Sequence, residues 1–294
     1  MVNYGNLPKF EFLVVTISAF LIAIFLMQTQ GVKRNNQYSP IENLPLPTVQ
    51  LNYQTGKEPQ ISARSALVID KTTQAIIFSK NPNLRFTPAS ATKIMTAYVA
   101  LQQYQLDDVI TIDNEKIPGS TIRLVPGEKI TVQNLLYGML LNSGNDAAYA
   151  LAKYHSKGVR GFVNDMNKAA RELELTNTHF TDPAGLEDEG NFTTTYDLSK
   201  LAIKAMENAT FRKIVSTKEK TVSGHELRNL NELLWQVPGV NGVKTGFTDI
   251  AGGVLVTSFE QGKTQLVIVV FKSEDRFADS KELIGWVLQA KQGQ

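Results

Sequence analysis

The chain has 294 residues, a net charge of +2 at pH 7 and no cysteine. This length is sufficient for one large hydrophobic core or for a core divided between two subdomains. The small net charge argues against a nucleic-acid partner, and the absence of cysteine excludes a thiol nucleophile and a disulfide framework. The three histidines are scattered and form no metal-binding pair, so the sequence indicates neither a metal site nor a cofactor.

The N-terminal region contains a candidate membrane anchor. Residues 12–27 carry no charge, and residues 28–31 can extend this run toward the ~20 residues that span a bilayer. No small-x-small cleavage site follows, which favours an uncleaved anchor over a signal peptide. We therefore expect a short cytoplasmic tail at 1–9 and a transmembrane signal anchor at 10–31. The proline-bearing, polar stretch at 32–60 is expected to be a flexible linker, followed by a catalytic domain at 61–294.

The first predicted elements of the domain are a β-hairpin and a helix. Residues 66–70 and 75–79 are β-rich runs separated by four residues typical of a turn. Thr87 as N-cap and Pro88 at the first helical position predict a helix that has Ser90 in its first turn and continues to about Leu101. Lys93 lies three residues after Ser90, on the same helix face, so it can reach the serine hydroxyl. To act as a base, Lys93 must be neutral, which requires burial or a nearby positive charge.

The middle of the chain has the periodicity of helices. Thr131 is expected to begin a helix whose apolar face includes Leu135 and Met139, and an alanine-rich helix follows from Asp146. The motif at 143–145 therefore falls in a tight connection between two helices, and a further amphipathic helix covers 159–173. In this position Ser143 can relay a proton to a leaving amine, and Asn145 can hold a substrate amide.

After Gly239 the periodicity changes to that of strands. Residues 243–247, 253–259 and 266–271 predict three antiparallel strands, and a last helix is expected from Ser280 to about Ala290. Both ends of the domain thus supply strands and the middle supplies helices. The predicted fold class is α+β: one antiparallel sheet built from both ends and flanked by helices, with an inserted all-helical subdomain.

The first of these late strands carries Lys244, Thr245 and Gly246. A charged Lys244 in the same cleft would lower the pKa of Lys93 and attract an anionic substrate end. Gly246 allows close approach, the strand can pair with an extended peptide, and the backbone N–H of Phe247 can serve as an oxyanion donor. The chain thus carries three motifs in order: the serine–lysine pair Ser90 and Lys93, Ser143-Gly-Asn145, and Lys244-Thr-Gly246. Together they predict an active-site serine acyltransferase that uses lysine as its base.

With these motifs the chain resembles the serine D-Ala-D-Ala carboxypeptidases among the low-molecular-mass penicillin-binding proteins, over roughly residues 63–289. Blocks at 85–90, 135–148, 182–186 and 242–252 also look like family sequence. The resemblance implies a penicillin-binding/β-lactamase-like fold and a peptidoglycan stem peptide ending in D-Ala-D-Ala as substrate. It also implies an acyl-Ser90 intermediate, covalent inhibition by β-lactams, and a catalytic domain on the extracytoplasmic face of the cell membrane. In the family an arginine near the last helix helps hold the terminal carboxylate, and Arg276 matches that position.

Two positions depart from the family pattern, and three other functions remain open. Ala184 and Phe247 stand where many members carry histidine, which affects fine specificity more than the chemistry. A D,D-endopeptidase that cuts cross-links would show nearly the same motifs. A class A β-lactamase would add a glutamate loop, which residues 187–191 imitate, and a non-catalytic penicillin sensor would need a signalling domain.

Overall fold

The computed structural model describes residues 58–186 and 190–292. The predicted cytoplasmic tail, membrane anchor and most of the linker lie outside these residues, so they stay predictions. Within the two described ranges, none of the helices combines the length and the apolar character needed to cross a bilayer.

A five-stranded antiparallel sheet organises the described residues, with the strand order β2-β1-β9-β8-β7. The two N-terminal strands form the predicted hairpin, and β1 pairs with β9, so the sheet is built from both ends of the domain as predicted. β7 lies at an edge of this sheet, which leaves one side of the strand without a sheet neighbour. The bounds are β1 Ser65–Asp70, β2 Ile76–Lys80, β7 Val240–Thr248, β8 Gly252–Gln261 and β9 Thr264–Ser273.

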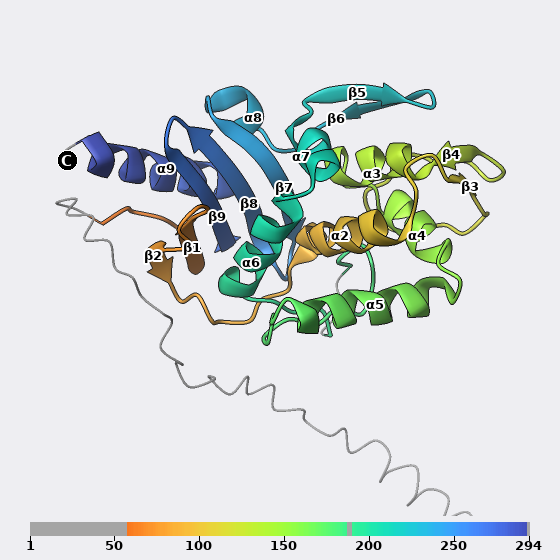
Figure 1. Ribbon diagram of the computed structural model, residues 1–294, viewed down its shortest axis with the longest axis horizontal. Helices are drawn as coiled ribbons and strands as arrows, with labels where there is room; N and C mark the ends of the chain where they lie inside the picture. The colour runs from red at the N-terminus through yellow and green to blue at the C-terminus, as the bar shows by residue number, and fades with distance from the viewer. Residues whose placement is uncertain (1–57, 187–189, 293–294) are drawn as a thin grey trace, which may run out of the picture. The chain divides into compact units, whose positions relative to one another are not determined.

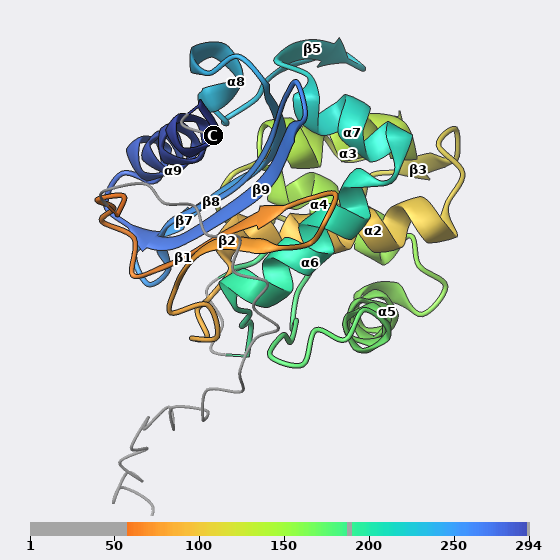
Figure 2. The same cartoon turned by 60° about the vertical axis from the view of Figure 1, so that its left-hand side comes forward.

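Helices cover both faces of the sheet. The C-terminal helix α9 (Arg276–Gln292) packs on β8 and β9 from one side, and α6 (Thr195–Met206) packs on β1 and β9 from the other (Figures 1 and 2). The remaining elements lie between β2 and β7 in the chain, as the predicted helical insertion requires. They are η1 Ala89–Thr92, α2 Lys93–Gln103, β3 Val109–Thr111, β4 Lys129–Thr131, α3 Val132–Leu141, α4 Asn145–Lys153, α5 Gly158–Glu172, α7 Ala209–Ser216, β5 Glu219–Val222, β6 His225–Arg228 and α8 Leu233–Gln236.

Alternation along the strands divides the core into two layers. Successive side chains of a strand point to opposite faces of the sheet, so each central strand contributes to both layers. The layer under α9 includes Leu283 and Val287 of that helix, and the other layer continues into the helical part of the domain. β9 shows the division: Val267, Val269 and Phe271 belong to the helical layer, and Leu266, Ile268 and Val270 belong to the α9 layer.

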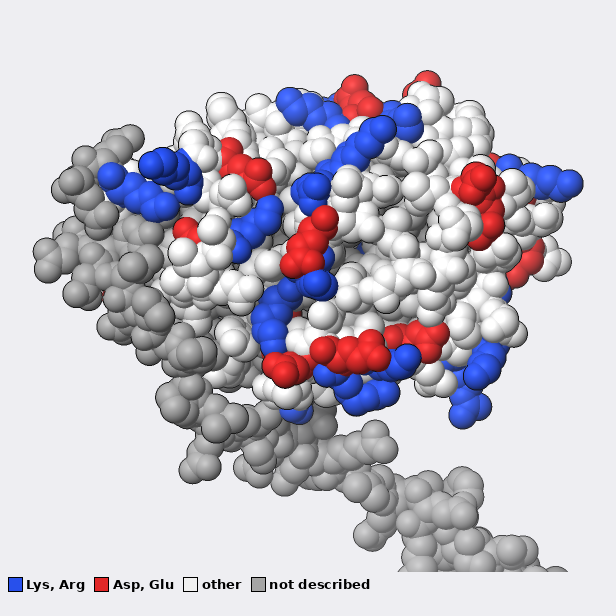
Figure 3. Space-filling view, in the orientation of Figure 1, with Lys and Arg blue, Asp and Glu red and all other residues white. Residues whose placement is uncertain are grey.

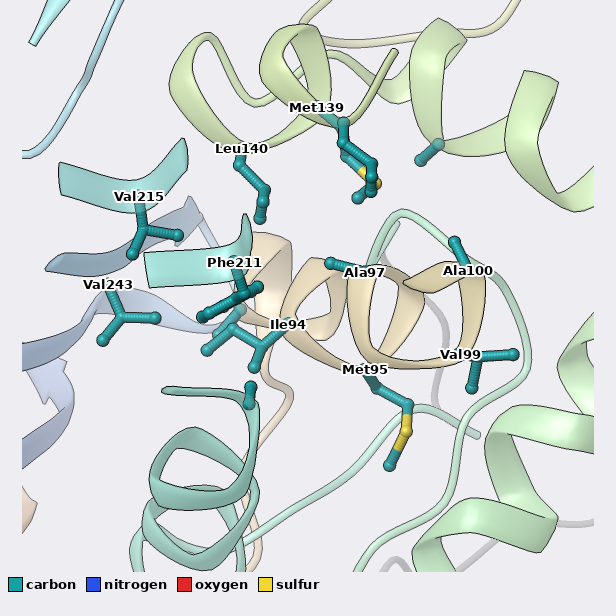
Figure 4. Packing of buried hydrophobic residues seen from close by; sticks show 14 of the residues in the cluster. Ile94, Met95, Ala97, Val99, Ala100, Met139, Leu140, Phe211, Val215 and Val243 are labelled. Atoms are coloured by element: carbon teal, nitrogen blue, oxygen red, sulfur yellow. The ribbon is translucent and has the colours of Figure 1, made fainter. Parts of the chain in front are cut away.

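Helix α2 runs through the centre of the helical layer. Its residues from Lys93 to Ala97 are all buried, and its side chains face helices on several sides. In Figure 4, Leu140 of α3 and Phe211 of α7 lie around α2, close to Val243 of β7. The first part of α2 is buried all round, so it is fixed by packing rather than by propensity and is a rigid place for functional side chains.

Charged side chains are distributed over the surface without large single-sign areas on the face shown in Figure 3. Lys and Arg lie interspersed with Asp and Glu there. This distribution agrees with the small net charge of the chain.

Two helix starts differ from the sequence-based prediction. Thr87 does not cap a helix, because Phe86 pairs with Thr193 in a β-bridge and helical bonding begins only with Ala91, whose N–H bonds to the Pro88 carbonyl. The last helix begins at Arg276, four residues earlier than expected. There the carboxylate of Asp275 accepts the backbone N–H groups of Phe277 and Ala278, as an N-cap residue does.

The beginning of the domain is fastened to α9 by one buried carboxylate. Asp279 accepts hydrogen bonds from the backbone N–H groups of Ser62 and Ala63, each at 2.8 Å, and from the hydroxyls of Ser62 and Ser273. Its side chain is buried, so removal of the carboxylate leaves several donors without a partner. An unsatisfied buried donor costs about 1–3 kcal/mol.

We therefore expect Asp279→Ala to lower the free energy of unfolding of the full-length protein by about 3 kcal/mol. Asp279→Asn retains one acceptor oxygen and should lose less. Denaturant titration followed by circular dichroism measures both, with the exposed Asp107→Ala as the control for loss of one carboxylate. An unfolding midpoint of Asp279→Ala equal to that of the Asp107 variant would contradict the role of this carboxylate.

Candidate active site

The structure brings Ser90 and Lys93 together as the sequence predicts. Ser90 lies in η1 and Lys93 is the first residue of α2, with its Nζ 2.9 Å from Ser90 Oγ. The lysine is completely buried, and its amino group also donates to Asn145 Oδ1 at 2.8 Å and to the carbonyl of Ala184 at 2.7 Å. Three groups from three distant parts of the chain therefore converge on one nitrogen.

These contacts define how a neutral Lys93 must be oriented. A neutral amine has two N–H groups and one lone pair. Asn145 Oδ1 and the Ala184 carbonyl can only accept, so they take the two N–H groups. The Ser90 hydroxyl is the one partner in this set that can donate, and the lone pair then faces it. Lys93 is thus positioned to remove the proton of Ser90.

The pKa of Lys93 is lowered well below its ordinary value. Burial is the larger cause, and the charge of Lys244 is the second, while Asp182 and Asp146 act in the opposite direction. Burial disfavours the charged amine because the ammonium loses its hydration, and a nearby positive charge adds to this effect. Burial and a nearby positive charge, the two causes that the sequence suggested, therefore both act on the pKa of Lys93, and burial has the larger effect.

The second motif lies in the connection between α3 and α4. Thr131 caps α3 by accepting the N–H of Asn134, as predicted, and α4 begins at Asn145. Ser143 is buried and has a left-handed φ of 61°, a conformation that costs energy outside glycine and is common at functional sites. Its Oγ lies 3.2 Å from the Nζ of Lys244, so the second motif contacts the third.

The third motif lies on the edge strand β7, where Lys244 and Thr245 are buried. Besides contacting Ser143, Lys244 Nζ donates to the carbonyl of Thr245 at 3.0 Å. Burial and the neighbouring charge of Arg276, in that order, lower the pKa of Lys244 to about 7. Lys244 is therefore a charge that titrates near neutrality, a property the motif alone does not reveal.

Gly246 brings β7 close to the serine. A Cβ at this position would lie 3.2 Å from the backbone nitrogen of Ser90 and 3.1 Å from Ala89 Cβ. With a larger residue at this position, β7 or η1 would have to give way by a few tenths of an ångström. The next residue, Phe247, is 62% exposed, and the oxyanion role of its backbone N–H stays a prediction.

Arg276 reaches the same region from the first position of α9. Its Cβ lies 3.5 Å from where a Cβ on Gly253 would be, and Gly253 pairs with Phe247 across β7 and β8. Arg276 is partly buried, its Nε has no hydrogen-bond partner among the described residues, and its charge acts on Lys244. The structure thus places a second cation beside Lys244, where an anionic substrate end could be held.

One part of the site was not assigned from the sequence: the loop at 182–186. The carboxylate of Asp182 accepts the N–H groups of Ala184 and Gly185 at 2.7 and 2.8 Å, which points the Ala184 carbonyl at Lys93. Gly185 has a φ of +76°, and a Cβ on it would lie 1.8 Å from the Ala89 carbonyl oxygen. The spacing of aspartate, proline and glycine was the available signal. Because Ala184 acts through its backbone, its contact with Lys93 does not depend on the side chain.

The glutamates of the β-lactamase-like stretch, residues 187–189, lie outside the described residues. Asn191 is described and buried, and its side-chain amide donates to Asp182 and to the Leu186 carbonyl. It therefore stabilises the 182–186 loop. Within the described ranges, no group of His, Asp and Glu side chains is arranged to hold a metal ion.

The sequence profile of the D-alanyl-D-alanine carboxypeptidase family matches residues 52–275. The chain belongs to this family. It is 37% identical over 221 residues to the D-alanyl-D-alanine carboxypeptidase DacF of Bacillus subtilis, which covers 71% of this chain and 57% of DacF. It is 36% identical over 240 residues to a D-alanyl-D-alanine carboxypeptidase of Streptomyces sp. K15, covering 74% of this chain and 82% of that protein.

Solved structures give the same result for the fold. The crystal structure of the Streptomyces K15 DD-transpeptidase superposes with a TM-score of 0.73 at 33% identity, covering 78% of this chain and 98% of that one. A penicillin-binding protein homologue from Mycobacterium tuberculosis superposes with a TM-score of 0.76 at 28% identity, covering 84% and 96%. The predicted fold class is therefore confirmed. The chain spans about six-tenths of the length of DacF and of the DacD and DacC proteins of Escherichia coli.

Proposed function

We propose that this protein is a serine D-alanyl-D-alanine carboxypeptidase that removes the terminal D-alanine from peptidoglycan stem pentapeptides through an acyl-Ser90 intermediate. The observation that carries the proposal is the 2.9 Å contact between Ser90 Oγ and the Nζ of a fully buried lysine whose other partners are both acceptors. Membership of the D-alanyl-D-alanine carboxypeptidase family supports the choice of substrate.

In the acylation step, neutral Lys93 takes the proton of Ser90 while Oγ attacks the carbonyl carbon of the penultimate D-alanine. The carbon–oxygen bond forms and the peptide C–N bond breaks. The proton that Lys93 took is relayed through Ser143 to the leaving amine, which leaves Lys93 neutral again. Ser143 suits this role because its hydroxyl lies within 3.2 Å of Lys244 Nζ. Water then attacks the acyl-enzyme, the ester bond breaks, and Ser90 regains its proton.

Binding of the substrate falls to the edge strand and its neighbours. The backbone N–H groups of Ser90 and Phe247 are proposed to hold the developing oxyanion, since Gly246 lets β7 approach Ser90 closely. Thr245 and the cations Lys244 and Arg276 would bind the terminal carboxylate. An extended stem peptide can pair with the free edge of β7, with Asn145 holding one of its amides.

The proposal includes attachment to the cell membrane through residues 10–31, with the linker at 32–60 and the catalytic domain at 61–294 on the extracytoplasmic face. Its support is the uncharged run at 12–27 and the absence of a cleavage site after it. Mapping the N-terminus of protein extracted from membranes tests this part. A mature chain that begins beyond Gln28 would overturn the anchor.

Three compounds distinguish this function from its competitors: a stem pentapeptide, a cross-linked peptide dimer and penicillin. We expect the full-length protein to release D-alanine from a pentapeptide and to gain the full mass of one penicillin on a peptide containing Ser90. Ser90→Ala serves as the blank and should show neither reaction.

Each competing function gives a different result. Cleavage of a cross-linked dimer in preference to the pentapeptide would indicate an endopeptidase, and rapid turnover of penicillin would indicate a β-lactamase. A stable penicillin adduct without any peptide hydrolysis would indicate a sensor. An adduct that persists in Ser90→Ala would place the nucleophile elsewhere.

A further inference from the structure

The segment at 118–124, in the connection between β3 and β4, contacts the site from outside the three motifs. The carbonyl of Pro118 accepts from Asn145 Nδ2 at 2.7 Å, and the carbonyl of Ser120 accepts the backbone N–H of Asn145 at 2.7 Å. A Cβ on Gly119 would lie 2.7 Å from Asn145 Nδ2, so the segment approaches the amide closely. The orientation of Asn145, and hence of the oxygen that accepts from Lys93, depends on where this segment lies.

The segment is in turn fastened by Asp146, the residue that follows Asn145. The Asp146 carboxylate accepts the backbone N–H groups of Ile122 and Leu124, each at 3.1 Å. The side chain of Ile122 is buried and packs on α3, where a Cβ on Gly138 would lie 2.4 Å from Ile122 Cδ1. Adjacent residues at the start of α4 therefore hold the two ends of one short segment.

On another side the segment borders a cavity of about 670 Å³, with Ile117, Thr121, Arg123, Asp146 and Tyr149 among the lining residues. Side chains beside a cavity have fewer packing contacts, so the hydrogen bonds to Asp146 carry a larger share of the restraint.

We propose that Asp146 is a positioning residue for the reaction at Ser90. Its carboxylate fixes the 118–124 segment, the segment orients the Asn145 amide, and the amide oxygen directs the amino group of Lys93 toward Ser90. Asp146 touches neither Ser90 nor substrate in this role. The inference rests on the proposed function, because it is the acylation of Ser90 that Asp146 supports.

The test compares Asp146→Ala with Asp146→Asn in the full-length protein. Both variants remove the same negative charge, so an electrostatic effect on Lys93 is common to them. Only the asparagine keeps an oxygen that can accept from Ile122 and Leu124, in the position now held by Oδ2. Asp113→Ala is the matched control, because Asp113 is an exposed carboxylate in the same connection that bonds to Lys153 and not to the segment.

Two measurements are made on each variant: the limiting rate of acylation by penicillin at saturation, and hydrogen exchange of a peptide that covers 119–125. We expect Asp146→Ala to lower the limiting rate about tenfold or more, since small displacements of catalytic groups have effects of this size, and to speed the exchange. Asp146→Asn and Asp113→Ala should stay within about threefold of the unmodified protein in rate. If Asp146→Ala fails to fold, Asp146→Ser takes its place, because a serine hydroxyl is too short to reach both amides.

Equal losses in the alanine and asparagine variants would show that charge is the cause, which overturns the proposal. Unchanged exchange at 119–125 in Asp146→Ala would overturn it as well, as would an unchanged rate. The exchange measurement does not depend on activity. An unmodified protein that fails to react with penicillin would therefore refute the proposed function separately from the fastening of the segment.

Discussion

Lys93→Ala is expected to slow acylation of Ser90 by penicillin by ~10²–10⁴-fold, the usual cost of losing a general base. In the described part of the chain, the amino group of Lys93 lies at hydrogen-bond distance from Ser90 Oγ, and the lone pair of the neutral amine faces that hydroxyl. Without Lys93, the serine proton has no acceptor at hydrogen-bond distance in the described structure. Stopped-flow measurement with a chromogenic penicillin gives the rate, and mass spectrometry identifies the adduct.

Lys93→Arg and Lys129→Ala complete this test. A guanidinium remains protonated at all accessible pH values, so arginine should be as inactive as alanine even though it keeps a side chain in the space. Lys129 is exposed on β4, and its removal should leave acylation unchanged. Acylation of Lys93→Ala within tenfold of the unmodified protein would place the base on another residue.

The sequence predicted the parts of the fold that have strong periodicity. The long strands β7, β8 and β9 alternate between two buried layers, α3 and α5 have apolar faces, and Thr131 marks the start of α3. The motifs then fixed which of these elements meet, because a serine–lysine pair, a loop and an edge strand must share one cleft. Ser90 and Asn145 both contact the amino group of Lys93, and Ser143 contacts that of Lys244.

The elements that were missed are two pairs of short strands and several helices of the middle region. The hairpin of β3 with β4 and that of β5 with β6 have strands of only three or four residues, too few to establish alternation. α6 and α7 were not predicted although each has a side-chain N-cap, at Thr194 and at Asn208. Threonine and asparagine at these positions are N-cap signals that the sequence itself carries.

Backbone contacts account for the part of the site that residue types could not reveal. The Ala184 carbonyl, aimed by Asp182, and the carbonyls of Pro118 and Ser120 act through atoms that every residue possesses. Their positions follow from turns such as that at Gly185, which only the folded chain specifies. The same reason explains Thr87: a threonine before a proline is a plausible cap until a β-bridge at Phe86 holds the chain extended.

Lys244→Gln is expected to weaken the use of pentapeptide and also to move the acid limb of the pH–rate profile to higher pH. Lys93 is active when neutral, so the rate rises with pH as this lysine loses its proton. The charge of Lys244 lowers the pKa of Lys93, and its removal therefore raises that pKa and shifts the limb upward. Burial, the larger cause, remains in the variant, so part of the depression of the pKa persists.

Arg276→Gln provides the matched comparison, because it also removes a positive charge, but one that acts on the pKa of Lys244 rather than on that of Lys93. Arg276 lowers the pKa of Lys244, which lies at about 7. Without Arg276, Lys244 stays protonated to higher pH and continues to depress the pKa of Lys93, so the acid limb should not move upward. Both variants should bind the substrate carboxylate more weakly, and only Lys244→Gln should raise the pKa of the base. An acid limb that stays in place in Lys244→Gln would show that burial alone keeps Lys93 neutral, and that Lys244 serves only to bind the substrate.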